Sequence, residues 1–397
     1  MMGCYRETRD LLSVLATLKH VSFEERLFVS IRSVNGPSSL STFGRFGDLG
    51  MALALLRVRG ITIWDAVSGK RILREARLAA SDQEHLKRLD GLSCVQWFDR
   101  LGVSGPLRST ILDPLCVGTL NERPQAASAA LLAIVIARAF SRDVRSGALG
   151  YIAVPQSDLL NQSAESFLKR SGGIIHRGTK VCDVVFDKNR AIGIRLANRD
   201  VICADSIVLA IPPRDIANVL ARSEPLRGGK LMQVPQQVPA PIVTCHLWYD
   251  RPSIQEKALW LLGSTYQVVF NYDAFRKPSG PPGHLAMVIS AANEEIRWTQ
   301  DQLVQKADSE LRLLCPEIGQ ARLVRSIVMK EMWATSSSRV GEMNSRPDVR
   351  TGYDGLWWAG DWTATMLPGT IEGAVVSGRD AARGILSSQT RRDRGSA

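Results

Sequence analysis

One stretch near the carboxyl terminus constrains the fold of this 397-residue chain more than any other. It starts with the apolar run Leu356–Ala359, passes through Gly360-Asp361 and a loop, and reaches a helix-favouring run from Thr370. A short, continuously apolar run is typical of a strand buried inside a sheet. A strand followed by a glycine, a carboxylate and a helix predicts an open α/β sheet with a ligand-binding edge.

The residues at this junction suit a ligand rich in hydroxyl and phosphate groups. Gly360 has no Cβ, so the backbone there can approach a ligand closely. Asp361 is expected at the carboxyl end of the strand, where its carboxylate can accept hydrogen bonds from sugar or ribityl hydroxyls. Free N–H groups near Thr370, at the start of the helix, favour electron-rich oxygens. A structural aspartate before a close-packed terminal helix explains the same pattern without a ligand.

The rest of the chain divides into segments of different periodicity. Apolar residues at helical spacing predict that residues 5–140 are mainly helical. The expected helices of the chain lie near 8–18, 82–100, 125–140, 160–168 and 300–314, and the fourth ends at Gly172-Gly173. Short β-rich runs between 174 and 202 predict a meander, and the apolar run Ser206–Ile211 predicts a strand buried on both faces of a parallel sheet. Further strands are expected at 242–249, 266–271 and 285–290.

Composition excludes several classes of protein. The seven cysteines include no CxxC and the five histidines no HxxxH or HExxH, so a metal site, an iron–sulfur cluster and a disulfide scaffold are not expected. Free thiols fit a reducing cytoplasm. The net charge of +11 comes from scattered residues, and no nucleic-acid partner is expected. The amino terminus lacks the apolar segment of a signal peptide, and the longest apolar run, Ala129–Ala137, is too short to span a bilayer.

Three segments resemble a known group of enzymes. They are Met2–Thr8, Leu112–Asn121 with Ala127-Ser128, and Ala359–Thr363 continuing through Leu367-Pro368 to Ser377-Gly378. The last is similar to the flavin-contacting motif of the amine oxidase and phytoene desaturase superfamily of FAD enzymes. The first two resemble, more narrowly, the squalene-associated FAD-dependent desaturases, which are hydroxysqualene dehydroxylases of squalene and hopanoid biosynthesis.

The resemblance implies an α/β fold, in which a Rossmann-like FAD/NAD(P)-binding domain carries an inserted α+β substrate domain. Residues 1–150 would be a mostly helical part of the substrate domain, and residues 216–345 would supply its sheet and further helices. Residues 151–215, with the meander, and residues 346–388 would form the FAD-binding segments. A flexible tail would occupy residues 389–397.

The sequence departs from this family at one point. Its members begin with a strand, a GxGxxG turn and a helix that hold the ADP half of FAD, whereas this sequence contains no GxG. The segment Gly44-x-x-Gly47-x-x-Gly50 does not replace that turn, because it has no tight first turn and no preceding apolar strand. We therefore expect the chain to lack the first βαβ unit and, as written, to bind FAD weakly or not at all.

The resemblance also implies roles for residues near the carboxyl terminus. Gly360 would lie against the cofactor, and Asp361 would bond its ribityl–phosphate region. Backbone groups from Thr370 through Ile371 to Glu372 would face the pyrimidine side of the flavin and stabilise negative charge on the reduced ring.

Two further residues are assigned more distant roles. Val181, at the start of the meander, would give a backbone contact to adenine. No proton donor stands out, and Asp113 is a candidate because it lies in one of the subfamily-specific segments. Asp-Pro is also a common turn starter, so a structural role for Asp113 stays open.

The implied reaction is the reductive dehydroxylation of hydroxysqualene to squalene, with FAD as cofactor and a long apolar isoprenoid as substrate. The run Ala129–Ala137 is typical of a buried helix, and it could instead line a substrate tunnel or touch a bilayer. A cytoplasmic protein is expected, with peripheral contact to the inner membrane face as an option. The alternatives are a carotenoid desaturase, an amine oxidase with an aromatic cage drawn from Trp333, Trp357, Trp358 and Trp362, and a non-catalytic remnant.

Overall fold

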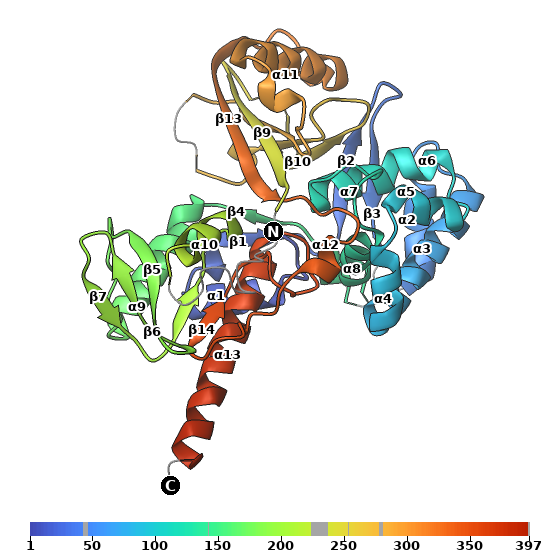
Figure 1. Ribbon diagram of the computed structural model, residues 1–397. Helices are drawn as coiled ribbons and strands as arrows, with labels where there is room; N and C mark the ends of the chain where they lie inside the picture. Colours follow the sequence, from blue (N-terminus) through green and yellow to red (C-terminus); the bar gives the residue numbers. More distant parts are fainter. Residues whose placement is uncertain (43–46, 142, 224–236, 253, 278–280, 396–397) are drawn as a thin grey trace.

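The computed structural model describes residues 1–397 except 43–46, 142, 224–236, 253, 278–280 and 396–397 (Figure 1). It separates a seven-stranded sheet with a helix on its outer face, a cluster of helices beside that sheet, and a third part that carries the chain's last helix (Figure 1). Among the described residues, no helix is both long and apolar enough to cross a membrane.

The large sheet places seven strands side by side. In spatial order they are β13 (Leu323–Ser336), β9 (Pro239–Tyr249), β12 (His284–Ile289), β11 (Val268–Asn271), β10 (Ala258–Leu261), β2 (Phe28–Arg32) and β3 (Ser38–Ser41). All neighbours are antiparallel except β10 and β2. Alternate residues of β9 are buried, as a strand with one face in a core requires. Helix α11 (Gln300–Leu314) covers that face and buries Leu303, Ala307 and Leu311, which are spaced by four.

The helical part forms the largest hydrophobic core of the described chain. Its elements are α2 (Gly47–Leu56), α3 (Ile63–Ser81), α4 (Gln83–Asp90), α5 (Cys94–Arg100), α6 (Gly105–Leu107), the π-helical η3 (Arg108–Leu112), α7 (Asp113–Leu120) and α8 (Ala129–Ala139). The side chains from Ala129 to Ala133 are fully buried, so α8 is the central helix of this core. The run Ala129–Ala137 is therefore a buried helix and is not available to a bilayer.

The third part contains the sheets nearest the predicted site. Its helices are α1 (Arg6–Val14), η1 (Leu18–His20), η4 (Val144–Gly147), η5 (Ser157–Asn161), α9 (Gln162–Arg170), α10 (Pro213–Leu220) and α13 (Ile371–Gly395), while α12 (Glu342–Ser345) packs on α4 of the helical part. Its strands are β1 (Val21–Phe23), β4 (Gly150–Ile152), β5 (Val181–Asp187), β6 (Arg190–Leu196), β7 (Val201–Cys203), β8 (Ile207–Leu209) and β14 (Leu356–Trp358). Strands β5, β6 and β7 form the predicted meander, and β8 pairs with β14 in parallel. The short turns η7 (Tyr272–Ala274), η8 (Glu295–Arg297) and η9 (Pro316–Ile318) lie beside the large sheet.

Several sequence expectations need correction. The first 150 residues hold the three strands β1, β2 and β3 as well as helices, and β2 and β3 extend the large sheet. The helix expected over 82–100 is two helices, because the chain turns at Gly91 before Ser93 caps α5. No strand forms at Ile174-Ile175. In β8 the side chain of Val208 is 39% exposed, so only one face of that strand is buried.

The end of the chain also differs from expectation. Helix α13 continues to Gly395, through most of the stretch expected to be a flexible tail. The hydroxyls of Ser387 and Ser388 bond back to the carbonyls of Arg383 and Gly384, 2.9 Å away in each case. Each serine hydroxyl donates to a carbonyl of the preceding helical turn. The side chains therefore bond within the helix and do not draw the backbone into another conformation.

Candidate functional site

A pocket lies at the carboxyl ends of β8 and β14, beside Asp361. It encloses about 810 Å³ of empty space, part of it open to solvent. The lining combines the segment after β8, the end of β13, the Gly360-Asp361 turn and one residue of α13. These residues are Ala210, Ile211, Pro212, Pro213, Arg214, Gln237, Trp333, Ala334, Thr335, Ser336, Ala359, Gly360, Asp361, Trp362 and Ala374. We call this space the Asp361 pocket; it is the cleft that the sequence predicts at this sheet edge.

Gly360 has a backbone conformation that other residues rarely adopt. Its φ is +152°, and a Cβ at this position would overlap the indole ring of Trp362. The Gly360 N–H donates a hydrogen bond to Ser377 Oγ at 2.8 Å, which ties the turn to α13. The indole N–H of Trp362 is buried and has no hydrogen-bond partner within the described chain. The glycine therefore lets the Trp362 indole pack directly against the turn, and the indole N–H remains an unused donor within the described chain.

Asp361 carries a carboxylate that is mostly enclosed. Burial raises its pKa, and the nearby Arg346 guanidinium and the backbone N–H groups of Asp361 and Trp362 oppose that shift. A Cβ at Gly369 would lie 3.2 Å from Asp361 Oδ2, so the glycine leaves room around this oxygen. The carboxylate can thus accept hydrogen bonds from a ligand in the pocket.

A buried arginine, Arg346, holds the loop that follows Asp361. Its Nη1 donates to the carbonyl oxygens of Asp361, at 3.1 Å, and of Leu367. Its Nε lies 3.0 Å from both carboxylate oxygens of Glu342, one turn earlier on α12. Burial raises the pKa of Glu342, and Arg346 opposes this. Sequence analysis did not single out Arg346, because a lone arginine after an ordinary segment carries no motif.

The start of α13 borders a different pocket. Thr370 and Glu372 line a space of about 410 Å³ that also contacts α7, α8 and the residues just before α1. The Glu372 carboxylate accepts hydrogen bonds from the N–H groups of Glu7 and Thr8, at 3.1 and 2.9 Å, and from Thr8 Oγ1 at 2.7 Å. The Glu372 side chain is thus the amino-terminal cap of α1. Neither the Ile371 N–H nor the Glu372 N–H has an acceptor within the described residues.

The structure therefore divides the predicted cofactor contacts into two neighbouring groups. Gly360 and Asp361 share the Asp361 pocket, while Thr370 and Glu372 share the pocket beside α1. Val181 begins β5 on the meander, pairs with Leu196, and lines neither pocket.

Asp113 begins α7 and also lines neither of these pockets. Its Oδ1 is buried without a hydrogen-bond partner in the described chain, and burial raises the pKa of the carboxyl, opposed by Arg108. Thr119, which borders the pocket beside α1, lies six residues further along α7, a rise of about 9 Å. A proton-donating role for Asp113 remains a prediction.

Asp113 allows a test by pH. A carboxyl whose pKa is higher in the folded state opposes folding when charged, so Asp113→Asn should raise the melting temperature at neutral pH. The advantage should shrink as pH falls through the raised pKa, where the wild-type group becomes neutral too. Thermal unfolding between pH 4 and pH 8 measures this, with the exposed Asp10→Asn on α1 as a control that should show no such trend. An Asp113→Asn variant less stable than wild type at pH 7 would contradict it.

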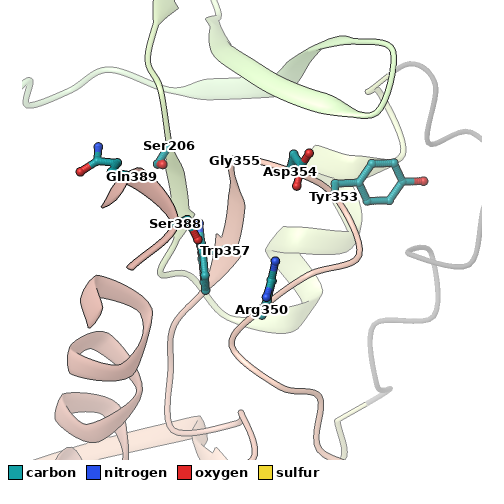
Figure 2. Close-up of a pocket in the computed structure, with 8 residues that line it drawn as sticks. All are labelled: Ser206, Arg350, Tyr353, Asp354, Gly355, Trp357, Ser388 and Gln389. Carbon is teal, nitrogen blue, oxygen red and sulfur yellow. The ribbon is translucent and has the colours of Figure 1, made fainter. Parts of the chain in front are cut away.

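A third pocket lies at the opposite ends of β8 and β14 (Figure 2). It encloses about 680 Å³ and is lined by Ser206, Arg350, Tyr353, Asp354, Gly355, Trp357, Ser388 and Gln389. Trp357 lines this pocket, whereas Trp362 lines the Asp361 pocket. The two indoles therefore lie at opposite ends of the β8–β14 pair. Within the described residues, no group of three or more His, Cys, Asp or Glu is placed to hold a metal ion.

Known proteins resemble this chain over most of its length. It is 27% identical over 293 residues to the hydroxysqualene dehydroxylase of Rhodopseudomonas palustris, which covers 73% of this chain and 65% of that protein. It is 21% identical over 402 residues to the 15-cis-phytoene desaturase of Glycine max, covering 97% and 69%. The chain thus spans a little under two thirds of the length of the dehydroxylase.

Solved structures show the same fold. A putrescine oxidase bound to putrescine matches with a TM-score of 0.68 at 17% identity, covering 96% of this chain and 86% of that one. An oxidoreductase from Methanosarcina mazei matches with a TM-score of 0.65 at 17% identity, covering 94% and 85%. The family model of flavin-containing amine oxidoreductases matches residues 17–386. These residues include the β14–Gly360-Asp361–α13 junction, and the chain belongs to the flavin-containing amine oxidoreductase family.

Proposed function

We propose that the Asp361 pocket holds the ribityl–phosphate end of FAD. Three observations on the chain support this. Gly360 borders the pocket in a backbone conformation that favours glycine, the buried Trp362 indole N–H lacks a partner within the described chain, and the Asp361 carboxylate stands at the carboxyl end of a parallel pair. The residues present therefore fit a ligand of this chemistry. The free N–H groups of Ile371 and Glu372 are suited to carbonyl oxygens or to negative charge on the ring.

We propose that the reaction is the reductive dehydroxylation of hydroxysqualene. An allylic C–O bond breaks, the hydroxyl leaves as water with one proton, and a hydride replaces it on carbon. FAD, when bound in its reduced form, supplies the hydride and therefore both electrons. The similarity to hydroxysqualene dehydroxylases is the observation that carries this choice.

The walls of the pocket suit an apolar substrate. Most of its lining is alanine, proline, isoleucine and tryptophan, and Trp333 joins it to the face of β13 that α11 does not cover. Exposed Ile327 and Met329 continue this face. Such a surface can exclude water from a long isoprenoid chain while the polar groups at Asp361 are kept for the cofactor.

A phytoene-type desaturation is the second candidate, because the similarity to phytoene desaturases extends over nearly the whole chain. Incubation of the flavin-loaded protein with hydroxysqualene or with phytoene, followed by product analysis, separates the two. Squalene formed under reducing conditions supports the first. Phytoene desaturation under oxidising conditions, without squalene formation, replaces it with the second.

Cofactor binding is tested most directly at Asp361. The expected result is that Asp361→Ala weakens FAD binding by roughly ten- to one-hundred-fold, because charge-assisted hydrogen bonds contribute about 1.5–3 kcal/mol each. Titration followed by quenching of flavin fluorescence measures the effect. Asp354→Ala is the matched control, since it removes an exposed carboxylate at the other end of β14. If the Asp361→Ala and Asp354→Ala variants bind FAD equally well, the proposed site is wrong.

A further inference from the structure

Helices α2 and α3 expose an unusual group of large apolar side chains. Trp64 is 80% exposed and Ile63 is 68% exposed, and Val67 follows one turn later on α3. Leu53 and Leu56, near the end of α2, are exposed as well. Figure 1 shows the two helices next to each other at the outer side of the helical part, where they also contact one another. We call these five residues the α2–α3 apolar face.

The end of α3 that carries Ile63 and Trp64 is firmly capped. Thr62 Oγ1 accepts from the Asp65 N–H at 3.3 Å, and Asp65 Oδ2 accepts from the Thr62 N–H at 2.7 Å. The other carboxylate oxygen of Asp65 accepts from the hydroxyl of Ser104, the residue before α6. Because both capping bonds and a tertiary bond fix this turn, the two large side chains are held outward by a rigid helix end.

Positive charge lies directly beside this apolar group. Lys70, Arg71 and Arg74 are exposed on the same stripe of α3, at positions seven, eight and eleven after Ile63. No exposed residue of α3 is acidic, since Asp65 is buried in its cap and Glu75 pairs with His85. An apolar cluster with a tryptophan and a fringe of lysine and arginine matches a surface with an apolar interior and anionic headgroups.

The inner side of the same helices is apolar too. Beneath α2 and α3 lies a pocket of about 440 Å³ whose lining is entirely apolar apart from backbone. Leu55 of α2 and Gly69 of α3 both line it, and a Cβ at Gly69 would come within 2.8 Å of the Leu55 side chain. Helices α2 and α3 therefore carry apolar side chains both toward solvent and toward this pocket.

We propose that the α2–α3 apolar face docks onto an anionic lipid bilayer, with Trp64 and Ile63 inserted at the headgroup level and Lys70, Arg71 and Arg74 against lipid phosphates. This docking goes beyond the proposed reaction and does not depend on it, because it is measured without flavin or turnover. It also moves the membrane contact away from α8, which is buried.

Flotation with vesicles of phosphatidylcholine and phosphatidylglycerol, at a three-to-one ratio, tests the docking. The wild-type protein should bind these vesicles, bind pure phosphatidylcholine much more weakly, and dissociate as salt is raised. The triple variant Lys70→Gln, Arg71→Gln, Arg74→Gln should lower the partition coefficient roughly 100-fold, at about five-fold per cation. The double variant Ile63→Ser, Trp64→Ser should lower it at least tenfold even at low salt.

The matched control is Leu313→Ser on α11, where a leucine is 66% exposed on a helix remote from this face. It should bind vesicles as the wild type does. Circular dichroism of every variant distinguishes lost docking from lost folding. If one of the two variants, apolar or charge, is misfolded, the other still tests the docking. Equal vesicle binding by all folded variants would overturn the proposal, as would a dimer in solution that depends on Trp64 while wild type ignores vesicles. Loss of FAD binding or of turnover has no bearing on this readout.

Discussion

Gly360→Ala is expected to destabilise the protein by about 2–6 kcal/mol and to abolish high-occupancy ligand binding in the Asp361 pocket. A φ of +152° is a glycine conformation, and strain of this kind costs about 1–3 kcal/mol in other residues. The added Cβ would also overlap the Trp362 indole, and overpacking costs about 1–3 kcal/mol more. Denaturant unfolding followed by tryptophan fluorescence measures the loss, because Trp358 and Trp362 are buried beside the substitution.

Gly352→Ala is the control for this substitution. Gly352 lies in the loop before β14, and a Cβ there would meet no atom within 4 Å. Its replacement should change stability by no more than about 0.5 kcal/mol. If Gly360→Ala is as stable as Gly352→Ala, the backbone at Gly360 relaxes easily, and the turn is not rigid.

The sequence predicted the site best where its signal is local. The β14–Gly360-Asp361–α13 junction is read from adjacent residues, because a buried strand, a glycine at the edge and a helix start all fall within one short segment. The meander and three strands of the large sheet, β9, β11 and β12, were likewise predicted from β-rich runs and polar turns, whereas β13, β10, β2 and β3 were not. In each case the physical cause lies within a few residues of the pattern.

Features that depend on distant partners were not predictable in this way. Glu372 caps α1 across 364 residues of chain, so its carboxylate has a structural role that no local pattern indicates. Strand β2 pairs in parallel with β10 from the other half of the chain, and its few residues carry little alternation. Arg346 is one of 50 lysines and arginines, and only its burial beside Glu342 distinguishes it.

Arg346→Met is expected to have the other large effect. Removing one partner of a buried ion pair costs about 3–5 kcal/mol, because the remaining carboxylate of Glu342 is left without compensation. The carbonyl oxygens of Asp361 and Leu367 lose their donor at the same time. The loop after Asp361 should therefore loosen, and FAD affinity should fall together with the free energy of unfolding. Arg346→Lys should recover little of the lost stability or FAD affinity. A single ammonium group cannot bond the Glu342 carboxylate and both carbonyl oxygens at once, as the planar guanidinium does.

The pH dependence and the double variant show whether the Glu342 charge causes this loss. Without Arg346, burial would raise the pKa of Glu342 further, so the stability deficit should be largest at neutral pH and shrink as acid protonates the carboxyl. The variant Arg346→Met, Glu342→Gln removes the uncompensated charge and should recover part of the stability but none of the FAD affinity, because the loop carbonyls still lack their donor. If the double variant were no more stable than Arg346→Met at any pH, the lost hydrogen bonds alone would account for the effect, and Arg346 would act by holding the loop and not by neutralising Glu342.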